Sequence, residues 1–451
     1  MAKQKRKFSI LKDKKSARNL LLISVFILFA KLILIFSLRD GAWLGADGES
    51  YLKGTDALIK DGWLSKDSVL TYWPAGYPIV IRALAYLSLS DAPRLLSIFQ
   101  SLVYFAAVAF FVEVLRQSKL KKLAIPAALI LGLNPTLALS SLVVGYESLS
   151  ASCMLASVAL IYRYQINSAH KSLLGTVIWV ALIQSFSGFM QPRNLLIGLI
   201  IFLVWGLFQA SRKKLFLILV VGTLVMLSLP FGLIFRNMSA NGSAVLSKNL
   251  SVNMTIGAGD SATGGYSDSG GLRCAPTPPA ATASDAQTIK CVLIWYAKHP
   301  TKSLKLFFNK TIYYWSPWSG PLRNGTMARN PWLKIDPIAK IESSASGRSV
   351  VEGWVGKTIS YIWLFGGLAF LVWGFLWVRR SDGLERQLAA LAGVPVVVGW
   401  LISLAFFGDH RFRLPSMGLS LFFQLAGYQA LKERFFRPST PSTLVAKPRT
   451  R

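Results

Sequence analysis

Long apolar runs separated by short polar segments make up most of this chain. Each run has roughly the 17 to 25 residues that cross a hydrocarbon core of about 30 Å as a helix. Because a bilayer core offers no water to backbone amides, the runs are predicted to be helices. The predicted spans are 20–38, 94–115, 123–139, 146–164, 173–190, 195–210, 215–235, 358–378, 387–407 and 414–431. The pattern therefore predicts an all-α polytopic membrane protein with about ten transmembrane helices.

The charge distribution supports that topology. Only 16% of the residues are charged and 53% are hydrophobic, which excludes an ordinary soluble domain. The net charge of +30 could indicate nucleic-acid binding. However, the basic clusters at 116–122, 212–214, 379–386 and 432–451 all lie on the side of the N-terminus if there are ten spans, as the positive-inside rule requires. We therefore predict a multi-pass protein of the cell membrane with both termini cytoplasmic, and no nucleic-acid partner.

The same pattern divides the chain into modules. The predicted order is a basic tail, a first transmembrane module that contains an outer loop, a long outer loop with juxtamembrane helices, a second transmembrane module and a second basic tail. Their ranges are 1–19, 20–235 (loop 39–93), 236–357, 358–431 and 432–451. Long non-spanning segments on one face of a helical bundle are typical of a catalytic or binding site. The sequence thus predicts a site on the extracytoplasmic side.

The long outer loop has three recognisable parts. Residues 240–288 are rich in Gly, Ser, Ala and Thr and are interpreted as a mobile lid or, equally, a solvated linker. Two apolar-periodic runs broken at Pro300 predict a pair of interfacial helices. Cys274 and Cys291 are expected to form a disulfide, with free thiols as the alternative.

The first outer loop carries the leading candidate for acid–base chemistry. Asp47 and Glu49 are acids near the bilayer exit, Tyr51 follows Asp47 by one helical turn, and Tyr77 lies in a Pro-Ala-Gly-Tyr-Pro turn. A carboxylate in such a place can take a proton from a hydroxyl. The alternative is a solvated loop acid, which is the interpretation we give to Asp40.

A second cluster lies between the last two predicted spans. The sequence Gly-Asp-His-Arg-Phe-Arg-Leu-Pro places His410, Arg411 and Arg413 in a very short outer loop, against the positive-inside rule. Arginine binds phosphate through two parallel hydrogen bonds, so a phosphate ligand would explain these charges. The alternative is contact with lipid headgroups. Arg193 is a similar exception, and Glu147 is a candidate to orient Arg193, contact a sugar or form a structural ion pair.

The sequence contains neither a phosphate-binding loop, nor a dinucleotide fingerprint, nor a Cys/His metal spacing. We therefore expect no cofactor and no nucleotide donor on the inner side, and a divalent metal is possible but not indicated.

The ordered motifs resemble those of the GT-C superfamily of membrane glycosyltransferases, especially the bacterial protein-mannosyltransferase and aminoarabinose-transferase group. The similarity covers most of the chain. It rests on Asp47 and Tyr51 followed by the Pro74–Pro78 turn, the Pro192–Arg193 pair, the Ala262–Tyr266 stretch, and Arg411–Pro415.

The resemblance implies transfer of a sugar from a polyprenyl-phosphate carrier to a protein, lipid or cell-wall glycan acceptor on the outer side. It implies inversion at the anomeric carbon with Asp47 as base. Glu49, Tyr51, Tyr77, Glu147, Arg193, His410, Arg411 and Arg413 are the predicted substrate-binding residues. Two positions depart from the family pattern, since Gly48 stands where a second acid is common and Ser50 where a basic residue is frequent.

Two other functions compete with this one. A ligase for preassembled lipid-linked glycans would also have a large outer loop. A lipid or solute transporter would be expected to show internal repeats and helices broken at mid-membrane, and we find no similarity between the two halves.

Overall fold

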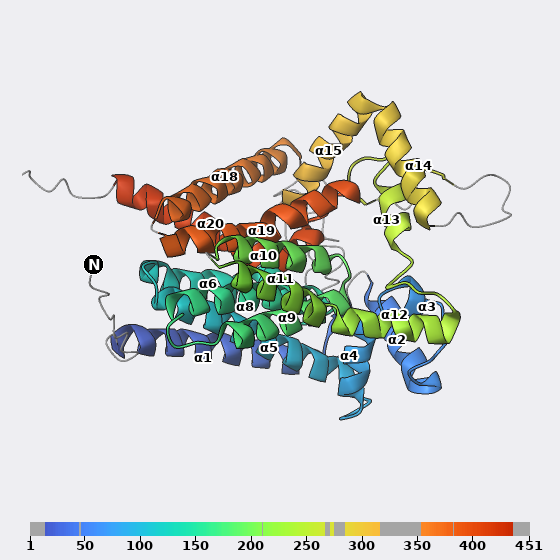
Figure 1. Ribbon diagram of the computed structural model, residues 1–451, viewed down its shortest axis with the longest axis horizontal. Helices are drawn as coiled ribbons and strands as arrows, with labels where there is room; N and C mark the ends of the chain where they lie inside the picture. Colours follow the sequence, from blue (N-terminus) through green and yellow to red (C-terminus); the bar gives the residue numbers. More distant parts are fainter. Residues whose placement is uncertain are drawn as a thin grey trace, which may run out of the picture.

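The computed structural model describes residues 14–44, 47–209, 211–266, 271–274, 285–315, 353–381 and 383–435. This part of the chain is mostly helical (Figure 1). The helices of its first half are α1 (Lys14–Ser37), α2 (Gly48–Asp61), α3 (Val69–Tyr72), α4 (Gly76–Ala85), α5 (Ala92–Arg116), η1 (Lys121–Leu123), α6 (Ala124–Leu133), α7 (Pro135–Ser140) and α8 (Glu147–Ile166). Those of the second half are α9 (Leu173–Met190), α10 (Asn194–Leu207), α11 (Arg212–Met226), α12 (Ser228–Asn241), α13 (Leu250–Ile256), α14 (Asp285–Lys298), α15 (Pro300–Trp315), α18 (Gly353–Arg380), α19 (Gly383–Ala405) and α20 (His410–Phe435). Two short strands, β1 (Trp43–Leu44) and β2 (Val143–Val144), pair in parallel.

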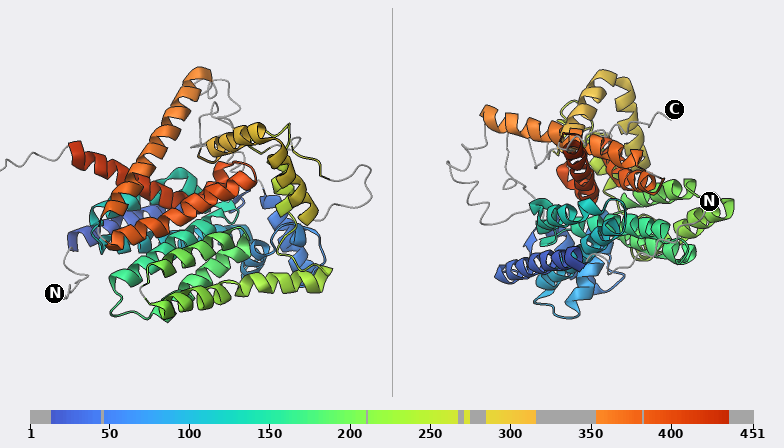
Figure 2. Two further views of the ribbon diagram at one scale, coloured as in Figure 1. Left: turned by 45° about the horizontal axis from the view of Figure 1, so that its top comes forward. Right: turned by 90° about the vertical axis from the view of Figure 1, so that its left-hand side faces the viewer.

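The long helices form a bundle whose members run side by side. Helix α8 packs against α5, α9, α19 and α20, and α18 packs along α20. Figures 1 and 2 show the short helices α2, α3, α4 and α13 to α15 gathered at one end of this bundle. We call this end the crown. The fold therefore has a membrane-type bundle and a crown built from two segments far apart in the sequence.

Six helical segments of the described chain are long and apolar enough to cross a membrane. They are Arg18–Ser37, Ala92–Arg116, Leu173–Met190, Arg212–Asn241, Tyr361–Arg380 and Gly383–Ala405. The remaining predicted spans are also helical, but α8 and α20 do not qualify on the same criteria of length and hydropathy, and α10 has only 14 residues. The all-α polytopic architecture is confirmed, whereas the count of ten spans and the orientation of the termini stay predictions.

The predicted span 123–139 is divided in two. Asn134 caps the second piece, α7, because its side chain accepts a hydrogen bond from the amide of Leu137. Pro135 occupies the first helical position, where its missing N–H costs nothing. The apolar run reads as continuous in sequence, but this Asn-Pro step ends α6 and starts a new helix.

Helix α12 extends past position 236, where the long outer loop is predicted to start. Helix α12 continues to Asn241, and the fully buried Arg236 uses its guanidinium to bind the carbonyls of Trp63 and Ser65 in the first loop. A short helix, α13, lies in the segment that the sequence indicated to be irregular.

The predicted helix pair and the predicted disulfide of this loop are both present. The chain forms the helix pair α14 and α15 on either side of His299–Pro300. Cys274 and Cys291 are joined in a disulfide, with 5.9 Å between their Cα atoms. Parts of the predicted lid, residues 267–270 and 275–284, lie outside the described residues, as do 316–352.

Replacing Gly76 by alanine is expected to destabilise the protein markedly. A Cβ atom at this position would lie 2.0 Å from the carbonyl oxygen of Phe189, so α4 would have to move away from the end of α9. Gly232 is a matched control, because a Cβ atom on this helical glycine meets nothing within 4 Å. We expect Gly76→Ala to lower the melting temperature in detergent by several degrees and Gly232→Ala to leave it unchanged or slightly raised. Equal melting temperatures would contradict the close approach.

Candidate functional site

Two acidic residues are brought together by the short parallel strand pair. Trp43 pairs with Val143 and Leu44 with Val144, and each strand leads within three residues to an acid at the start of a helix. Asp47 is the residue that precedes α2, and Glu147 is the first residue of α8. The positive end of a helix dipole favours a carboxylate in both positions.

Arg411 binds both of these acids. Its Nε donates to Oε1 of Glu147 at 2.6 Å, and an Nη atom donates to Oδ2 of Asp47. The Glu147 side chain is 2% exposed, and those of Arg411 and Asp47 are 14% and 17% exposed. Three charged groups, one just before α2 and one each on α8 and α20, therefore form one cluster, which we call the acid–arginine cluster. It carries two negative charges and one positive charge in a site that retains some access to solvent.

The turn before α20 fixes the backbone that carries Arg411. Oδ1 of Asp409 accepts the amide N–H of Arg411 at 2.9 Å and lies 3.0 Å from Nδ1 of the buried His410. Burial by itself raises the pKa of the Asp409 carboxyl, but the hydrogen bond from His410 and the contacts with Arg411 outweigh it and hold this pKa below its usual range. Asp409 thus serves as an ionised cap for this turn.

A group of tyrosines lies beneath the acid–arginine cluster. The ring centroid of Tyr51 is 5.0 Å from that of Tyr77 and 6.2 Å from that of Tyr146, with edge-to-face geometry in both pairs. Tyr51 is only 2% exposed, and burial together with nearby Asp47 raises the pKa of its phenol well above the ordinary value. Tyr51 therefore remains neutral and packs in the interior beside the charged residues.

Tyr77 supports the site from within the protein. Its hydroxyl accepts the amide N–H of Gly145 at 2.8 Å and donates to Oε1 of Gln100 at 3.2 Å. The amide nitrogen of Gln100 donates in turn to the carbonyls of Ser141 and Val143. This buried network anchors the segment that ends at Glu147, and the contact of Tyr77 with substrate stays a prediction.

Arg193 contacts Tyr146, one of the tyrosines near the acid–arginine cluster. It donates to the Tyr146 hydroxyl at 2.9 Å, and its guanidinium lies 4.1 Å from the ring centroid of Phe412. Gln191 donates to the same hydroxyl at 2.8 Å. The sequence offered Arg193 as the partner of Glu147, whereas the structure pairs Glu147 with Arg411.

Arg413 does not join Arg411. It is buried, its Nη1 donates to the carbonyl of Trp315 at 2.8 Å, and its guanidinium lies 5.8 Å from the Trp315 ring. Residues two apart on a helix point in different directions, and α20 already begins at His410. From the sequence, this stretch is predicted to be a short outer loop whose two arginines bind one phosphate. The structure instead gives Arg413 a role in holding the end of α15.

The structure shows why Gly48 stands where GT-C proteins commonly have a second acid, and where the nearby Glu49 lies. Glu49 is exposed in the first turn of α2. A side chain at Gly48 would press on Leu44 and on the carbonyl of Val144, at 3.2 and 3.4 Å. The second acid beside Asp47 is thus Glu147, supplied by the neighbouring strand. In the part of the chain that the structure describes, no group of three or more His, Cys, Asp or Glu residues gathers as a metal site.

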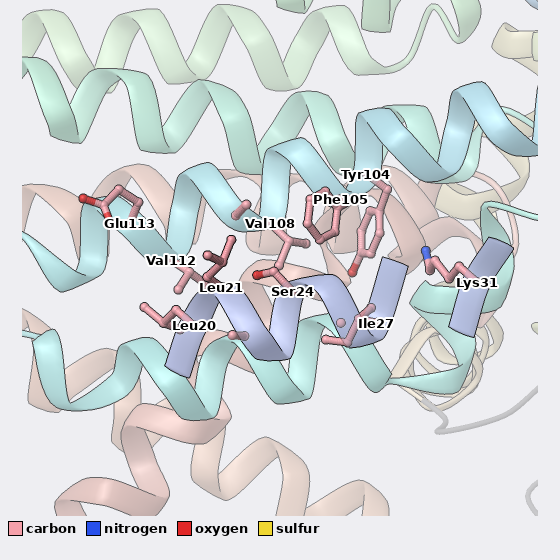
Figure 3. Close-up of a pocket in the computed structure, with 13 residues that line it drawn as sticks. Leu20, Leu21, Ser24, Ile27, Lys31, Tyr104, Phe105, Val108, Val112 and Glu113 are labelled. Atoms are coloured by element: carbon pink, nitrogen blue, oxygen red, sulfur yellow. The ribbon is translucent and has the colours of Figure 1, made fainter. Parts of the chain in front are cut away.

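Lys31 belongs to a different part of the bundle. A cavity of about 220 Å³ lies between α1, α5 and α6, with Lys31 near one end and Glu113 near the other (Figure 3). The Lys31 ammonium donates to the Ser141 hydroxyl at 3.0 Å and lies 4.8 Å from the ring centroid of Tyr104. It neither snorkels to the surface nor reaches the acids, but it supports the segment that leads into β2.

Lys310 links the crown to the segment that carries Arg411. This side chain, on α15, is fully buried, and its amine donates to the carbonyl of Leu404 and to the hydroxyl of Tyr296, both at 2.7 Å. The Tyr296 hydroxyl donates to the carbonyl of Gly257 at 2.9 Å. The backbone of Lys310 also lies against Gly408, where a Cβ atom would be 2.2 Å from the Lys310 carbonyl oxygen. Helices α14 and α15 are therefore held against the turn before α20 by these contacts.

Stability is expected to depend on the protonation of Lys310. Burial lowers the pKa of its amine from 10.5 to about 7, and burial raises that of Tyr296 to about 12, so Tyr296 stays neutral in this range. Between pH 7 and 10.5 the unfolded chain keeps the Lys310 proton and the folded chain does not. The free energy of unfolding therefore rises with pH across this window, by a few kcal/mol at most.

Thermal unfolding at pH 6.5 and pH 9.5 tests this prediction. The rise in melting temperature with pH should be smaller for Lys310→Met than for the unchanged protein, because methionine does not titrate. Lys302→Met is the control, since Lys302 is exposed and pairs with Asp260. An equal pH dependence for Lys310→Met and the unchanged protein would show that this amine keeps its ordinary pKa.

Several residues of the site could not be assigned from the sequence. Tyr146, Gln191 and Phe412 position Arg193, and Gln100 holds the segment before Glu147. A glutamine inside an apolar span was the one signal available for Gln100, because buried amides in a membrane need hydrogen-bond partners. The others look like ordinary interfacial aromatic or loop residues.

The fold and the acid–arginine cluster together define an all-helical polytopic membrane protein with a charged site at the crown. No protein-family model matches this chain, and no curated protein sequence matches it. Its fold is similar to that of the oligosaccharyltransferase AglB of the archaeon Archaeoglobus fulgidus in two solved structures, each with a TM-score of 0.50 and 12% sequence identity.

One of these structures carries a tethered acceptor peptide with an NVT sequon, and the other an inhibitory peptide and a dolichol-phosphate. The similarity covers 94% and 95% of this chain but 50% and 53% of those chains. The chain thus spans about half the length of these neighbours. The likeness shows a shared fold.

Proposed function

We propose that this protein is a membrane glycosyltransferase that moves a sugar from a polyprenyl-phosphate carrier to an acceptor hydroxyl on the extracytoplasmic side. The observation that carries the proposal is the acid–arginine cluster, in which Arg411 joins Asp47 to Glu147. A lipid-phosphate sugar needs a base for the acceptor and a cation for the departing phosphate. Both groups are present in one cluster at one end of a membrane bundle.

The chemical step is a single displacement. The acceptor oxygen forms a bond to the anomeric carbon while the bond from that carbon to the phosphate oxygen breaks, so the configuration inverts. The acceptor proton passes to the Asp47 carboxylate, and the electron pair of the broken bond stays on the phosphate. Arg411 and Arg193 compensate the charge that develops there. The role of Glu147 is to hold and orient Arg411 through its short hydrogen bond.

Arg411 is well suited to this task because its side chain is already held in place. Two carboxylates bind it, so a phosphate that approaches meets a guanidinium whose position is fixed. Its hydrogen bond to Asp47 is exchanged for one to phosphate as the donor binds. This exchange leaves Asp47 able to accept the proton of the acceptor.

A second candidate is transfer of a preassembled glycan. The fold similarity to an oligosaccharyltransferase favours it, since that protein binds a peptide and a dolichol-phosphate. This chain, however, matches only about half of that protein. We therefore place transfer of a single sugar first, with protein, lipid and cell-wall glycan as the acceptor classes.

Product analysis tests the proposal. Purified protein in nanodiscs is incubated with a panel of polyprenyl-phosphate monosaccharides and, separately, with polyprenyl-pyrophosphate oligosaccharides. Consumption of one monosaccharide carrier with release of polyprenyl phosphate is the expected result. Consumption of oligosaccharide carriers alone would establish the ligase function, and consumption of neither, with correctly folded protein and an acceptor lysate present, would overturn both.

A further inference from the structure

Three arginines line a hollow at the end of the bundle opposite the crown. Arg379 and Arg380 end α18, Arg386 lies in the first turn of α19, and Leu376 completes the lining of this space of about 330 Å³. All three arginines are exposed. Among the residues that the structure describes, no carboxylate pairs with them, since the nearby Glu385 is buried and accepts a hydrogen bond from Tyr162. Asp382 lies outside the described residues.

An apolar wall continues from this hollow along the bundle. Leu376 and Trp373 lie one turn apart on α18 and are 38% and 42% exposed. Only 17% of the apolar stretch of this helix is buried against the rest of the protein, so most of its residues face outward. Arg434 of α20 adds a fourth positive charge, with its guanidinium 5.8 Å from the Trp373 ring. The arginines thus lie at one end of an exposed apolar surface, formed by Trp373 and Leu376, against which acyl chains could pack.

We propose that this hollow is a binding site for an anionic phospholipid, with its phosphodiester held by Arg379, Arg380 and Arg386 and its acyl chains lying along Trp373 and Leu376. Guanidinium groups bind phosphate oxygens through directed pairs of hydrogen bonds. Basic pockets between transmembrane helices bind such headgroups. The site is separate from the acid–arginine cluster, and the proposal does not depend on the function assigned there.

Native mass spectrometry of the full chain in detergent measures this binding directly. The probes are dioleoyl-phosphatidylglycerol, dioleoyl-phosphatidylcholine and inorganic phosphate. We expect tighter binding of phosphatidylglycerol than of phosphatidylcholine. Each Arg→Gln substitution at 379, 380 or 386 is expected to weaken phosphatidylglycerol binding about fivefold, because each basic residue near an anionic headgroup contributes about 1 kcal/mol.

The cluster Arg212, Lys213 and Lys214 provides a matched control. It begins α11 at the same end of the bundle and carries the same charge, and all three residues are exposed. If Arg212→Gln, Lys213→Gln and Lys214→Gln together weaken phosphatidylglycerol binding as much as the triple change at 379, 380 and 386, bulk charge alone is responsible and the site is refuted.

A second variant distinguishes a lipid from a free anion and does not remove charge. Leu376→Gln is expected to weaken phosphatidylglycerol binding and to leave the binding of inorganic phosphate unchanged, because it alters only the apolar wall. Inorganic phosphate that binds as tightly as phosphatidylglycerol would overturn the assignment to lipid. Binding of phosphatidylglycerol that survives in the triple variant would overturn it as well.

Discussion

Replacing Asp47 by asparagine is expected to lower sugar transfer by about two to four orders of magnitude while the protein still folds and inserts. Asparagine has nearly the same shape and still accepts a hydrogen bond from Arg411 through its carbonyl oxygen. It cannot take the acceptor proton. The measurement is the initial rate of transfer from the carrier identified in the panel, compared at equal amounts of protein in nanodiscs.

Asp40→Asn is the matched control for this change. Asp40 is an exposed acid in the same first outer loop, and it lies after the end of α1, outside the acid–arginine cluster. Its replacement should leave the rate within about twofold. If Asp47→Asn keeps a normal rate, Asp47 is not the base. If both substitutions lower the rate equally, the loop as a whole matters and the specific role of Asp47 is lost.

A second readout separates a lost base from a distorted site. A base that only accepts the proton should affect the rate at saturating donor and leave the concentration of donor at half-maximal rate nearly unchanged. Loss of the hydrogen bond between Asp47 and Arg411 would instead change how the donor binds. The two kinetic constants of Asp47→Asn therefore show which function the carboxylate serves.

The fold was predictable from the sequence to the extent that it depends on long apolar runs. The bundle helices follow from these runs because a helix pairs all of its own amide groups in the bilayer, and because the runs have the length of spanning helices. The break at Asn134 and the extension of α12 were not predictable in the same way. They depend on one cap and on the contact of Arg236 with the first loop, and neither changes the hydropathy pattern.

The site was predictable in part, for a related reason. Asp47 and Arg411 stood out because their charges oppose their surroundings, and the structure brings them into contact. Glu147 stands out as a charge at the start of a span, but its position close to Asp47 does not follow from the sequence, because it depends on a strand pair of two residues that joins positions 100 apart. So short a pairing leaves no period in the sequence. The separation of Arg413 from Arg411 does not follow from the sequence, because the start of α20 at His410 cannot be read from a turn rich in charge.

Removal of the Arg411 guanidinium is expected to affect both activity and stability. Arg411→Met leaves the buried carboxylate of Glu147 and the partly exposed one of Asp47 without their shared cation. A buried charge that loses its partner costs about 3 to 5 kcal/mol. We expect a melting temperature several degrees below that of the unchanged protein and a transfer rate at least 100-fold lower.

The double variant Arg411→Met with Glu147→Gln separates these two effects. Glutamine removes the buried negative charge, so the double variant should recover most of the melting temperature that Arg411→Met alone loses. It should not recover transfer, because no guanidinium remains to meet the departing phosphate. The two measurements are thermal unfolding in detergent and the rate of transfer at saturating donor. Recovery of both would mean that Arg411 acts only by neutralising Glu147, and failure to recover stability would mean that the ion pair is not what holds α8 to α20. Recovery of stability alone is the outcome that assigns Arg411 to the chemistry.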